Sequence, residues 1–370
     1  MSKNKMRIAT IIWKDGFGGA ERSICDLAAA LDRSCFEMRF FYLNGGPGFF
    51  ADKIKQIGFE TKFLGWRNGF DIAGRIRLLQ KLKEFNPHVI HDHIIPLLTR
   101  SFLKIFLRKP TLYTEHGVAL QRSLGLGERW RRYIEKFDFR FCDYIAANSA
   151  ASAIALKSTY QIPYQKIGTV HLGINLDQFN PSFSQQPIKD FLTIGYVGRI
   201  LNAHKGVDYL PFVARNLKKK YGEIRFKFIV AGDGPDREKV EQLCREVDVY
   251  GHFTFLGWIR DVKCFLQQID ILLVPSRFEP LGLTAIEALA MNVPVVAFDV
   301  HGLREILGDC PAGFLVKPGD TESMAEIVYF LCNNHMQIGS KGREFVAQRF
   351  SNNKMARAYE NIYRHLNKSY

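Results

Sequence analysis

The stretch Asp270–Asp299, DILLVPSRFEPLGLTAIEALAMNVPVVAFD, decides how this chain folds. The apolar run Ile271–Val274 is short enough for a buried parallel strand. The prolines of Pro275–Pro280 end that strand, and Leu281–Met291 is rich in residues that favour a helix. A second buried strand, Val293–Phe298, follows. The pattern predicts a strand–loop–helix–strand unit of a parallel sheet.

Two glutamates bracket the start of this predicted helix. Glu279 lies in the loop at the carboxyl end of the strand, and Glu287 lies inside the otherwise apolar helix. Ligands of open α/β sheets bind at that edge. The backbone N–H groups at a helix start can hold an anion there, and here they belong to Gly282, Leu283 and Thr284. In the plainer interpretation, Glu279 is a solvated loop acid and Glu287 is an exposed helix position. This stretch alone does not decide between the two interpretations.

Length and cysteine content limit the class of protein. The 370 residues exceed one typical core and predict two domains of about 180 residues each. No apolar run approaches the ~20 residues that span a bilayer, and the N-terminus runs into a strand without a signal-peptide pattern. The seven cysteines are scattered and form no CxxC pair, which favours reduced thiols in a cytoplasmic protein over a zinc site.

The net charge of +14 is concentrated in the first half of the chain. Residues 1–183 carry 27 Lys and Arg against 16 Asp and Glu, a net +11, whereas residues 184–370 carry 24 against 21. Such a field favours an anionic partner, which could be a membrane surface, a phosphorylated acceptor or nucleic acid. Nucleic acid is disfavoured because no motif for binding it is present. A generally solvating surface is the plainer alternative.

The first half alternates between strands and helices, which predicts a doubly wound parallel sheet. Its first strand, Arg7–Trp13, leads into a glycine-rich loop with Gly18 and Gly19. Such a loop lets the backbone approach a phosphate or a sugar. It lacks the third glycine of the dinucleotide fingerprint, however, and a bare glycine turn is the better interpretation of the loop by itself.

Three histidines follow strands of this first sheet. His91 and His93 end one strand, and His116 follows the next. A metal site made of all three is disfavoured because nothing in the sequence fixes their geometry, and ordinary loop histidines are the alternative. His116 precedes a glycine and is expected to point into a crevice, where it can hydrogen-bond a sugar hydroxyl or take part in proton transfer.

The alternation restarts at Phe191, after an irregular linker at 171–184. A strand ends just before Arg199, and a loop then leads to Lys205. Two cations facing the helix start near Leu283 would enclose a diphosphate, although either could be a surface charge.

Another turn of the second half follows a strand at Leu256 and Gly257. It could offer backbone groups to a nucleotide base, or it could be a simple tight turn.

The last predicted helix, Asn352–Leu366, is amphipathic. Met355, Tyr359, Ile362 and Leu366 recur at helical spacing. This face must pack against another surface, and a return to the first domain is one option.

Taken in order, several short motifs resemble those of the retaining, nucleotide-sugar-dependent glycosyltransferases of family 4, which have the GT-B fold. They are GGAER at 18–22, EHG at 115–117, GINLD at 173–177, GR at 198–199, KG at 205–206, AGDGP at 231–235, FLG at 255–257 and the glutamate pair 279 and 287. Each motif alone is weak, but the series spans nearly the whole chain. One departure is His301, which stands where the family commonly has the first glycine of a Gly-Gly pair.

The resemblance implies an α/β fold with two Rossmann-like doubly wound parallel-sheet domains, an inter-domain cleft and a C-terminal helix that crosses back. We therefore expect an acceptor-binding domain at 1–178, completed by the helix 352–370. A donor-binding domain is expected at 184–351.

The resemblance also implies a role for each candidate position. Arg199 and Lys205 would bind the donor diphosphate and offset the charge of the departing nucleoside diphosphate, Glu279 would hold the donor sugar, and His116 would contact it near the reacting carbon. The expected donor-binding positions are Gly18, Gly19, Arg199, Lys205, Leu256, Gly257, Gly282, Leu283, Thr284 and Glu287. Among these, Glu287 would hold the ribose, and Leu256 with Gly257 would lie near the base.

The implied reaction is transfer of a hexose from a UDP- or GDP-sugar to a cell-envelope polysaccharide or a lipid-linked acceptor. The enzyme would be cytoplasmic, at or near the inner face of the membrane. Neither a metal nor any other cofactor is expected, because no Asp-x-Asp pair is present. A sugar-nucleotide epimerase of the same fold and a non-catalytic sugar-nucleotide-binding subunit are the alternatives.

Overall fold

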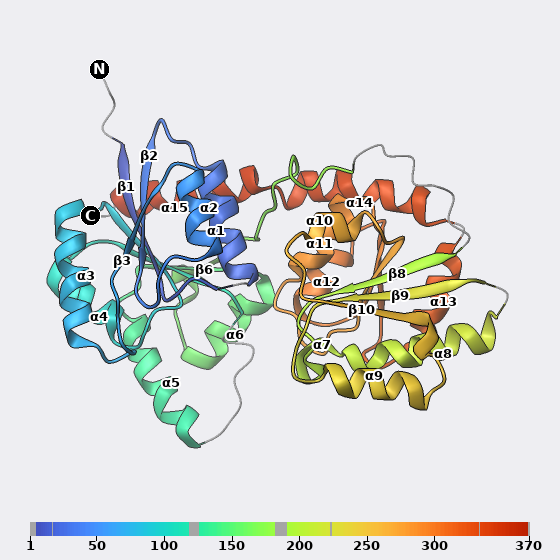
Figure 1. Cartoon of the computed structure of the whole chain (residues 1–370). Coiled ribbons are helices and arrows are strands. Elements are labelled where there is room, and N and C mark those ends of the chain that lie inside the picture. Colours follow the sequence, from blue (N-terminus) through green and yellow to red (C-terminus); the bar gives the residue numbers. More distant parts are fainter. Residues whose placement is uncertain are drawn as a thin grey trace. The chain divides into compact units, whose positions relative to one another are not determined.

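The computed structural model describes residues 5–16, 18–117, 126–181, 191–222, 224–332 and 334–368. The chain divides into two compact units, unit 1 with Met1–Gly173 and Asn352–Tyr370, and unit 2 with Ile174–Ser351. Each unit is a parallel sheet with helices on its faces (Figure 1). Among the described residues, no helix combines the length and the apolar character that crossing a bilayer requires.

Unit 1 is built on a seven-stranded sheet in the order β3-β2-β1-β4-β5-β6-β7, in which every pairing is parallel. Its strands are β1 (Met6–Ile12), β2 (Phe36–Tyr42), β3 (Glu60–Phe63), β4 (Val89–His93), β5 (Thr111–Glu115), β6 (Tyr144–Ala147) and β7 (Ile167–Thr169). Its helices are α1 (Gly19–Ala30), α2 (Phe49–Gln56), α3 (Ile72–Phe85), α4 (Thr99–Leu107), α5 (Leu126–Phe139), α6 (Ala150–Tyr160) and α15 (Asn352–Lys368).

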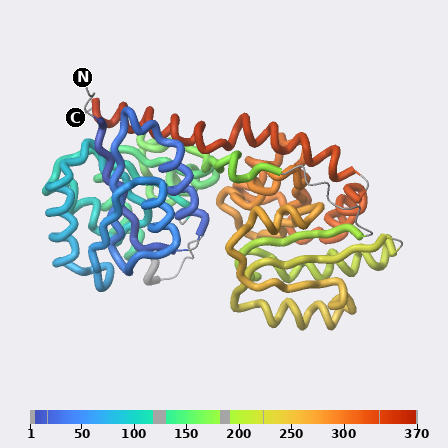
Figure 2. The backbone as a smooth tube through the Cα atoms, turned by 45° about the horizontal axis from the view of Figure 1, so that its top comes forward, coloured from blue at the N-terminus to red at the C-terminus, as the bar shows by residue number. Residues whose placement is uncertain are grey.

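Both faces of this sheet are covered because its central strands are apolar on both sides. On one face, Leu78 and Leu82 of α3 and Leu103 of α4 pack against Ile11 and Phe41. The other face is covered by α1, α2 and the C-terminal helix α15, which lies along α1 (Figures 1 and 2). The last helix therefore completes the fold of unit 1.

The buried face of α15 differs by one residue from the predicted one. Met355, Tyr359 and Leu366 are buried as predicted, but the fourth position is Tyr363, which is fully buried, and not Ile362. The Tyr363 hydroxyl hydrogen-bonds His91 Nδ1 at 2.8 Å. A tyrosine can occupy this apolar interface because its hydroxyl has a buried partner.

Unit 2 is built on a six-stranded parallel sheet in the order β10-β9-β8-β11-β12-β13. Its strands are β8 (Leu192–Val197), β9 (Phe226–Ala231), β10 (Phe253–Gly257), β11 (Ile271–Val274), β12 (Val295–Phe298) and β13 (Gly313–Val316). Its helices are α7 (Asn202–Lys205), α8 (Leu210–Lys220), α9 (Arg237–Glu246), α10 (Val262–Leu266), α11 (Leu283–Ala290), α12 (His301–Leu307), α13 (Thr321–Cys332) and α14 (His335–Arg349). Helices α8 and α13 pack together, as do α11 and α14.

Two local predictions in unit 2 are corrected. Helix α11 begins at Leu283 and not at Leu281, because Gly282 has a left-handed backbone with φ of +104°. The predicted loop before Lys205 contains the short helix α7.

The boundary between the units lies at Gly173/Ile174, five residues before the predicted end of the first domain at 178. Ile174 forms a β-bridge with Ser351, Phe179 is buried, and Arg343 donates to the carbonyl of Leu176. These contacts hold 174–179 in unit 2. The end of the predicted linker, residues 182–184, lies outside the described residues.

Candidate functional site

The central pair of strands in unit 2 marks a topological switch point. From β8 the chain moves outward to β9 and β10, and it then returns to β11 on the other side of β8. The loops that follow β8 and β11 therefore leave the same edge in opposite directions. In open α/β sheets the crevice outside the carboxyl ends of such strands is where ligands bind. Arg199 and Lys205 follow β8, and Glu279 follows β11.

Lys205 and Glu279 form an ion pair across this crevice. The Lys205 Nζ lies 2.5 Å from Glu279 Oε2, with the two side chains 30% and 10% exposed. The Ser276 hydroxyl lies 3.4 Å from the same carboxylate oxygen. A largely buried carboxylate is thus held together with a partly accessible ammonium group at the place where a ligand of this fold binds.

Further contacts fasten the two loops together. Arg277 binds both oxygens of Asp208, at 2.6 and 2.7 Å, and also donates to the carbonyl of Asn202. The Phe278 N–H donates to the His204 carbonyl at 2.9 Å. Because bidentate guanidinium–carboxylate pairs fix geometry, Lys205 and Glu279 are held on a rigid frame.

Gly206 allows the first of these loops to turn beneath the second. Its φ is +59°, and a Cβ atom there would overlap the carbonyl oxygen of Pro275. We expect Gly206→Ala to lower the free energy of unfolding by about 2–4 kcal/mol, through backbone strain and this overlap. Gly251→Ala is the matched control, because a Cβ there meets nothing within 4 Å. Urea denaturation checks the pair, and equal stabilities would contradict this account of the turn.

The start of α11 lies beside the ion pair, and its first backbone N–H groups have no acceptor among the residues that the structure describes. Gly282 is its N-cap and has no capping side chain, so the first N–H groups of the helix, including those of Leu283 and Thr284, have no intrahelical acceptor. Glu287, one turn further on, is completely buried. The alternative of an exposed Glu287 on the helix surface is therefore wrong.

The remaining candidates in unit 2 are less enclosed. Arg199 is exposed and forms no ion pair with any described residue, although the Tyr196 hydroxyl donates to its carbonyl at 2.9 Å. Leu256 and Gly257 end β10, two strands away from β8. Leu256 is 45% exposed, and Gly257 has φ of +71° with its carbonyl bound by the Gly232 N–H.

In unit 1, Gly18 and Gly19 lie at the carboxyl edge where β1 ends. Gly18 is the N-cap of α1, and its N–H donates to Glu21 Oε2 at 3.1 Å. The site candidates of the chain thus fall into two groups. The residues from Arg199 to Glu287 belong to unit 2, whereas Gly18, Gly19 and His116 belong to unit 1.

A chain of buried polar side chains leads to His116. The His93 Nδ1 lies 3.0 Å from His116 Nε2, and the His91 ring lies 4.1 Å from the His93 ring. His91 in turn contacts Tyr363 and the Thr114 hydroxyl, at 2.8 and 2.7 Å. The loop interpretation of His91 and His93 is corrected, because both lie in strand β4.

The described residues contain no group of three His, Cys, Asp or Glu side chains arranged to hold a metal ion. All seven cysteines are free thiols.

Two family models match the chain, one in each unit. The model of Glycosyltransferase Family 4 matches residues 17–178, and the model described as Glycosyl transferases group 1 matches residues 192–334. The chain is a glycosyltransferase of the family 4 type. The two matches contain the carboxyl edges of both sheets, where the candidate residues lie.

This glycosyltransferase is similar to other proteins along most of its length. An uncharacterised glycosyltransferase of Haemophilus influenzae is 24% identical over 343 residues, which are 88% of this chain and 91% of the relative. The 2-deoxystreptamine N-acetyl-D-glucosaminyltransferase of Niallia circulans is 26% identical over 272 residues, 68% of this chain and 69% of the relative. The crystal structure of HepE from Anabaena in complex with UDP has a TM-score of 0.81, with 19% identity, and covers 96% of this chain and 99% of its own. The predicted GT-B fold class is confirmed.

The histidines of the glycosyltransferase are held neutral by burial. Burial lowers the pKa of His91 to about 3 and that of His116 to about 4, and it lowers the pKa of His93 as well. Since His93 and His116 are both neutral, one proton lies between their facing nitrogens. Only one of the two outer nitrogens, His93 Nε2 and His116 Nδ1, then carries a hydrogen, and neither has a hydrogen-bond partner among the described residues.

These histidines make the enzyme sensitive to acid. An unfolded histidine titrates near 6.5, so below that pH the unfolded chain binds protons that the folded chain excludes. The contribution of the buried neutral histidines to the free energy of unfolding is complete above about pH 7. It is lost as the pH falls toward 4, at up to about 1.4 kcal/mol per pH unit for each histidine. Urea midpoints measured from pH 7.5 to 5 check this. His93→Asn should flatten the dependence, and exposed His365→Gln should not; equal slopes in both variants would contradict the assignment.

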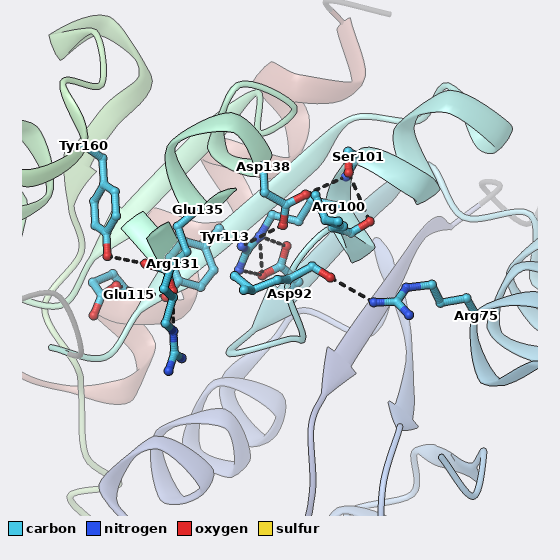
Figure 3. Close-up of polar contacts among 12 residues, drawn as sticks. Arg75, Asp92, Arg100, Ser101, Tyr113, Glu115, Arg131, Glu135, Asp138 and Tyr160 are labelled. Carbon is cyan, nitrogen blue, oxygen red and sulfur yellow. Dashed lines mark hydrogen bonds and ion pairs between the residues drawn. The ribbon is translucent and has the colours of Figure 1, made fainter. Parts of the chain in front are cut away.

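A second buried network in unit 1 surrounds Arg100. Its guanidinium lies 2.9 Å from Asp92 and 3.4 Å from Asp138, with all three side chains at most 5% exposed. Figure 3 shows Arg100 between the two carboxylates, with the Tyr113 ring beside it. The guanidinium carbon lies 4.2 Å from the centre of that ring. Burial opposes the charge of Arg100, but the adjacent carboxylates outweigh it and raise its pKa. This network ties β4 to α4 and α5 beneath the edge that carries the histidines.

Sequence reasoning missed the residues that fasten the site. The Arg277–Asp208 pair and the tyrosines that reach His91 and Thr114 are tertiary contacts between distant positions. Two signals were available in the sequence: Arg277 lies in the same loop as Glu279, and Tyr363 follows Ile362 of the predicted helix face.

Proposed function

We propose that this glycosyltransferase moves a hexose from a UDP-sugar to a hydroxyl of a carbohydrate or lipid-linked acceptor, with retention of the anomeric configuration. The observation that carries this proposal is the Lys205–Glu279 pair beside the uncapped start of α11, at the switch point of unit 2. A cation and free backbone amides in one crevice are what a diphosphate requires.

The chemistry of the transfer uses the same groups. Breaking the bond between sugar and phosphate builds negative charge on the departing diphosphate. Lys205, Arg199 and the amides of Leu283 and Thr284 are positive groups that would offset this charge, and such stabilisation is usually the largest contribution to a step of this kind. We propose that the reaction needs no metal, because these groups supply the positive charge themselves.

The ion pair also explains how one crevice can hold both parts of the donor. Before the donor binds, Glu279 neutralises Lys205. When the diphosphate draws the Lys205 ammonium toward itself, the Glu279 carboxylate is released to accept hydrogen bonds from hydroxyls of the sugar. Glu287 would then hold the ribose, and Leu256 with Gly257 would flank the base.

Two further features support the choice of donor and acceptor. HepE of Anabaena was solved with UDP and with UDP-glucose, which favours uridine over guanosine for this chain. The acceptor would bind unit 1, which carries Gly18, Gly19 and His116. The net +11 of residues 1–183 favours an acceptor at the anionic inner face of the cell membrane, as in the synthesis of cell-envelope polysaccharides.

Thermal shift with UDP, GDP and uridine tests the donor assignment. A ligand that binds only the folded chain stabilises it by RT ln(1 + [L]/Kd), so UDP should raise the melting temperature and uridine should have little effect. Stabilisation by GDP alone would replace UDP by GDP in the proposal. No effect of either diphosphate would contradict the site itself. Incubation with UDP-glucose but no acceptor tests for an epimerase, which would yield a second UDP-hexose.

A further inference from the structure

His301 has a backbone conformation that is unusual for its place in the fold. Its φ is +35°. The other non-glycine residues of unit 2 with positive φ, among those described, are Asp248 and Asn292, which follow the last turns of α9 and α11. A left-handed residue is common at such helix ends. His301 instead begins α12, where helix geometry does not require it.

The conformation of His301 follows from a close approach of two loops. The N–H of Gly302 donates to the carbonyl of Glu279 at 3.1 Å. A Cβ atom at Gly302 would overlap the carbonyl oxygen of Pro280, so the two backbones are in direct contact. The loop after β12 is thereby held against the loop that carries Glu279 and leads into α11.

This approach places the His301 imidazole beside the loop that carries Glu279. The His301 ring centre lies 4.9 Å from that of Phe278, the residue that precedes Glu279. Burial and the nearby Arg304 lower the pKa of His301, and Glu279 opposes them. The imidazole is therefore neutral at physiological pH, and it can donate one hydrogen bond and accept another.

We propose that His301 selects the transferred sugar, by a hydrogen bond between its imidazole and a hydroxyl of the donor hexose. Strained backbone persists where the structure around it demands it, and it is concentrated at functional sites. Glycine would adopt this conformation without cost, so the imidazole is what the residue at 301 contributes. The inference rests on the proposed function, because it assumes that the diphosphate lies at Lys205.

Binding of UDP, UDP-glucose, UDP-galactose and UDP-N-acetylglucosamine to wild type and His301→Gly, measured by calorimetry, tests this selection. We expect the Kd of UDP to change by less than about twofold, because the variant keeps the diphosphate site. The ratio of Kd values between the tightest and the weakest UDP-sugar should fall by about tenfold, since a hydroxyl-specific hydrogen bond is lost. The melting temperature of His301→Gly should not fall, because strain is relieved.

Two companion variants complete the test. Asp248→Gly removes a left-handed residue remote from the crevice and should leave every Kd unchanged. His301→Asn keeps a polar group that tolerates the left-handed conformation, so it should retain part of the discrimination. A ratio that is unchanged in His301→Gly, or a wild type that binds all three sugars equally, would overturn the role of His301. Failure of UDP to bind the wild type would instead contradict the proposed function.

Discussion

Replacing Lys205 by alanine should reduce kcat for sugar transfer by about 100- to 1000-fold, the usual cost of removing one group that stabilises developing negative charge. The ammonium of Lys205 is the partly accessible cation of the crevice and lies 2.5 Å from Glu279. Its loss removes positive charge where the departing diphosphate gains negative charge. It also leaves the 10% exposed Glu279 carboxylate without its cation, which would repel the diphosphate. Both effects are stronger in the transition state than in the bound donor, because the diphosphate gains negative charge as the bond to the sugar breaks.

Lys218→Ala is the matched control for this variant. Lys218 also belongs to unit 2 and forms an ion pair, with Asp248, but the two side chains are 46% and 95% exposed. Its removal should leave kcat within about twofold, because exposed ion pairs contribute little. Steady-state release of nucleoside diphosphate measures both variants, and urea denaturation confirms that they are folded. A folded Lys205→Ala enzyme with the turnover of the control would show that Lys205 does not hold the diphosphate.

Replacing Arg100 by leucine should lower the free energy of unfolding by about 3–5 kcal/mol, which is the second large effect. The substitution leaves the carboxylates of Asp92 and Asp138 buried at 0% exposure without their cation (Figure 3). Removing one partner of a buried pair lowers the stability more than replacing the whole pair by apolar residues, because an isolated buried charge is strongly unfavourable. Adding Asp92→Asn to the variant should recover part of the loss.

The control for Arg100 is a surface pair in the same unit. Lys81 lies 2.8 Å from Glu84, but their side chains are 45% and 60% exposed. Lys81→Ala should change the stability by no more than about 0.5 kcal/mol. Urea denaturation followed by tryptophan fluorescence compares the two variants. If Arg100→Leu lowered the free energy of unfolding by less than about 1 kcal/mol, water would reach the network and burial would not dominate its energetics.

Much of the fold could be predicted because it depends on local patterns. Strand β11 has the predicted bounds Ile271–Val274, since a short apolar run between turn-forming residues has few alternatives. The first strand likewise lies within one residue of its predicted range Arg7–Trp13, because β1 is Met6–Ile12. The error at the start of α11 arose because the propensity of Leu281 favours a helix, whereas the backbone of Gly282 turns away from one.

The neighbourhood of the candidate site could be predicted from the sequence, but the contacts between its residues could not. The positions of Lys205 and Glu279 after strand ends could be predicted, but their ion pair joins residues 74 positions apart. Such a pairing depends on the order β8-β11 in the sheet, which a single sequence does not contain. The same reason hid the contact between His93 and His116. On α15, apolar periodicity predicted Ile362 as the buried residue, because such a pattern contains no information on the buried hydrogen-bond partner of the Tyr363 hydroxyl.

A crystal structure of the enzyme with UDP bound tests most directly whether the diphosphate lies at the switch point of unit 2. We predict diphosphate oxygens at about 3 Å from Lys205 Nζ and from an N–H group at the start of α11, with Glu279 no longer bound to the lysine. A nucleotide seated on unit 1, or one whose diphosphate points away from a Lys205 that still binds Glu279, would contradict the account.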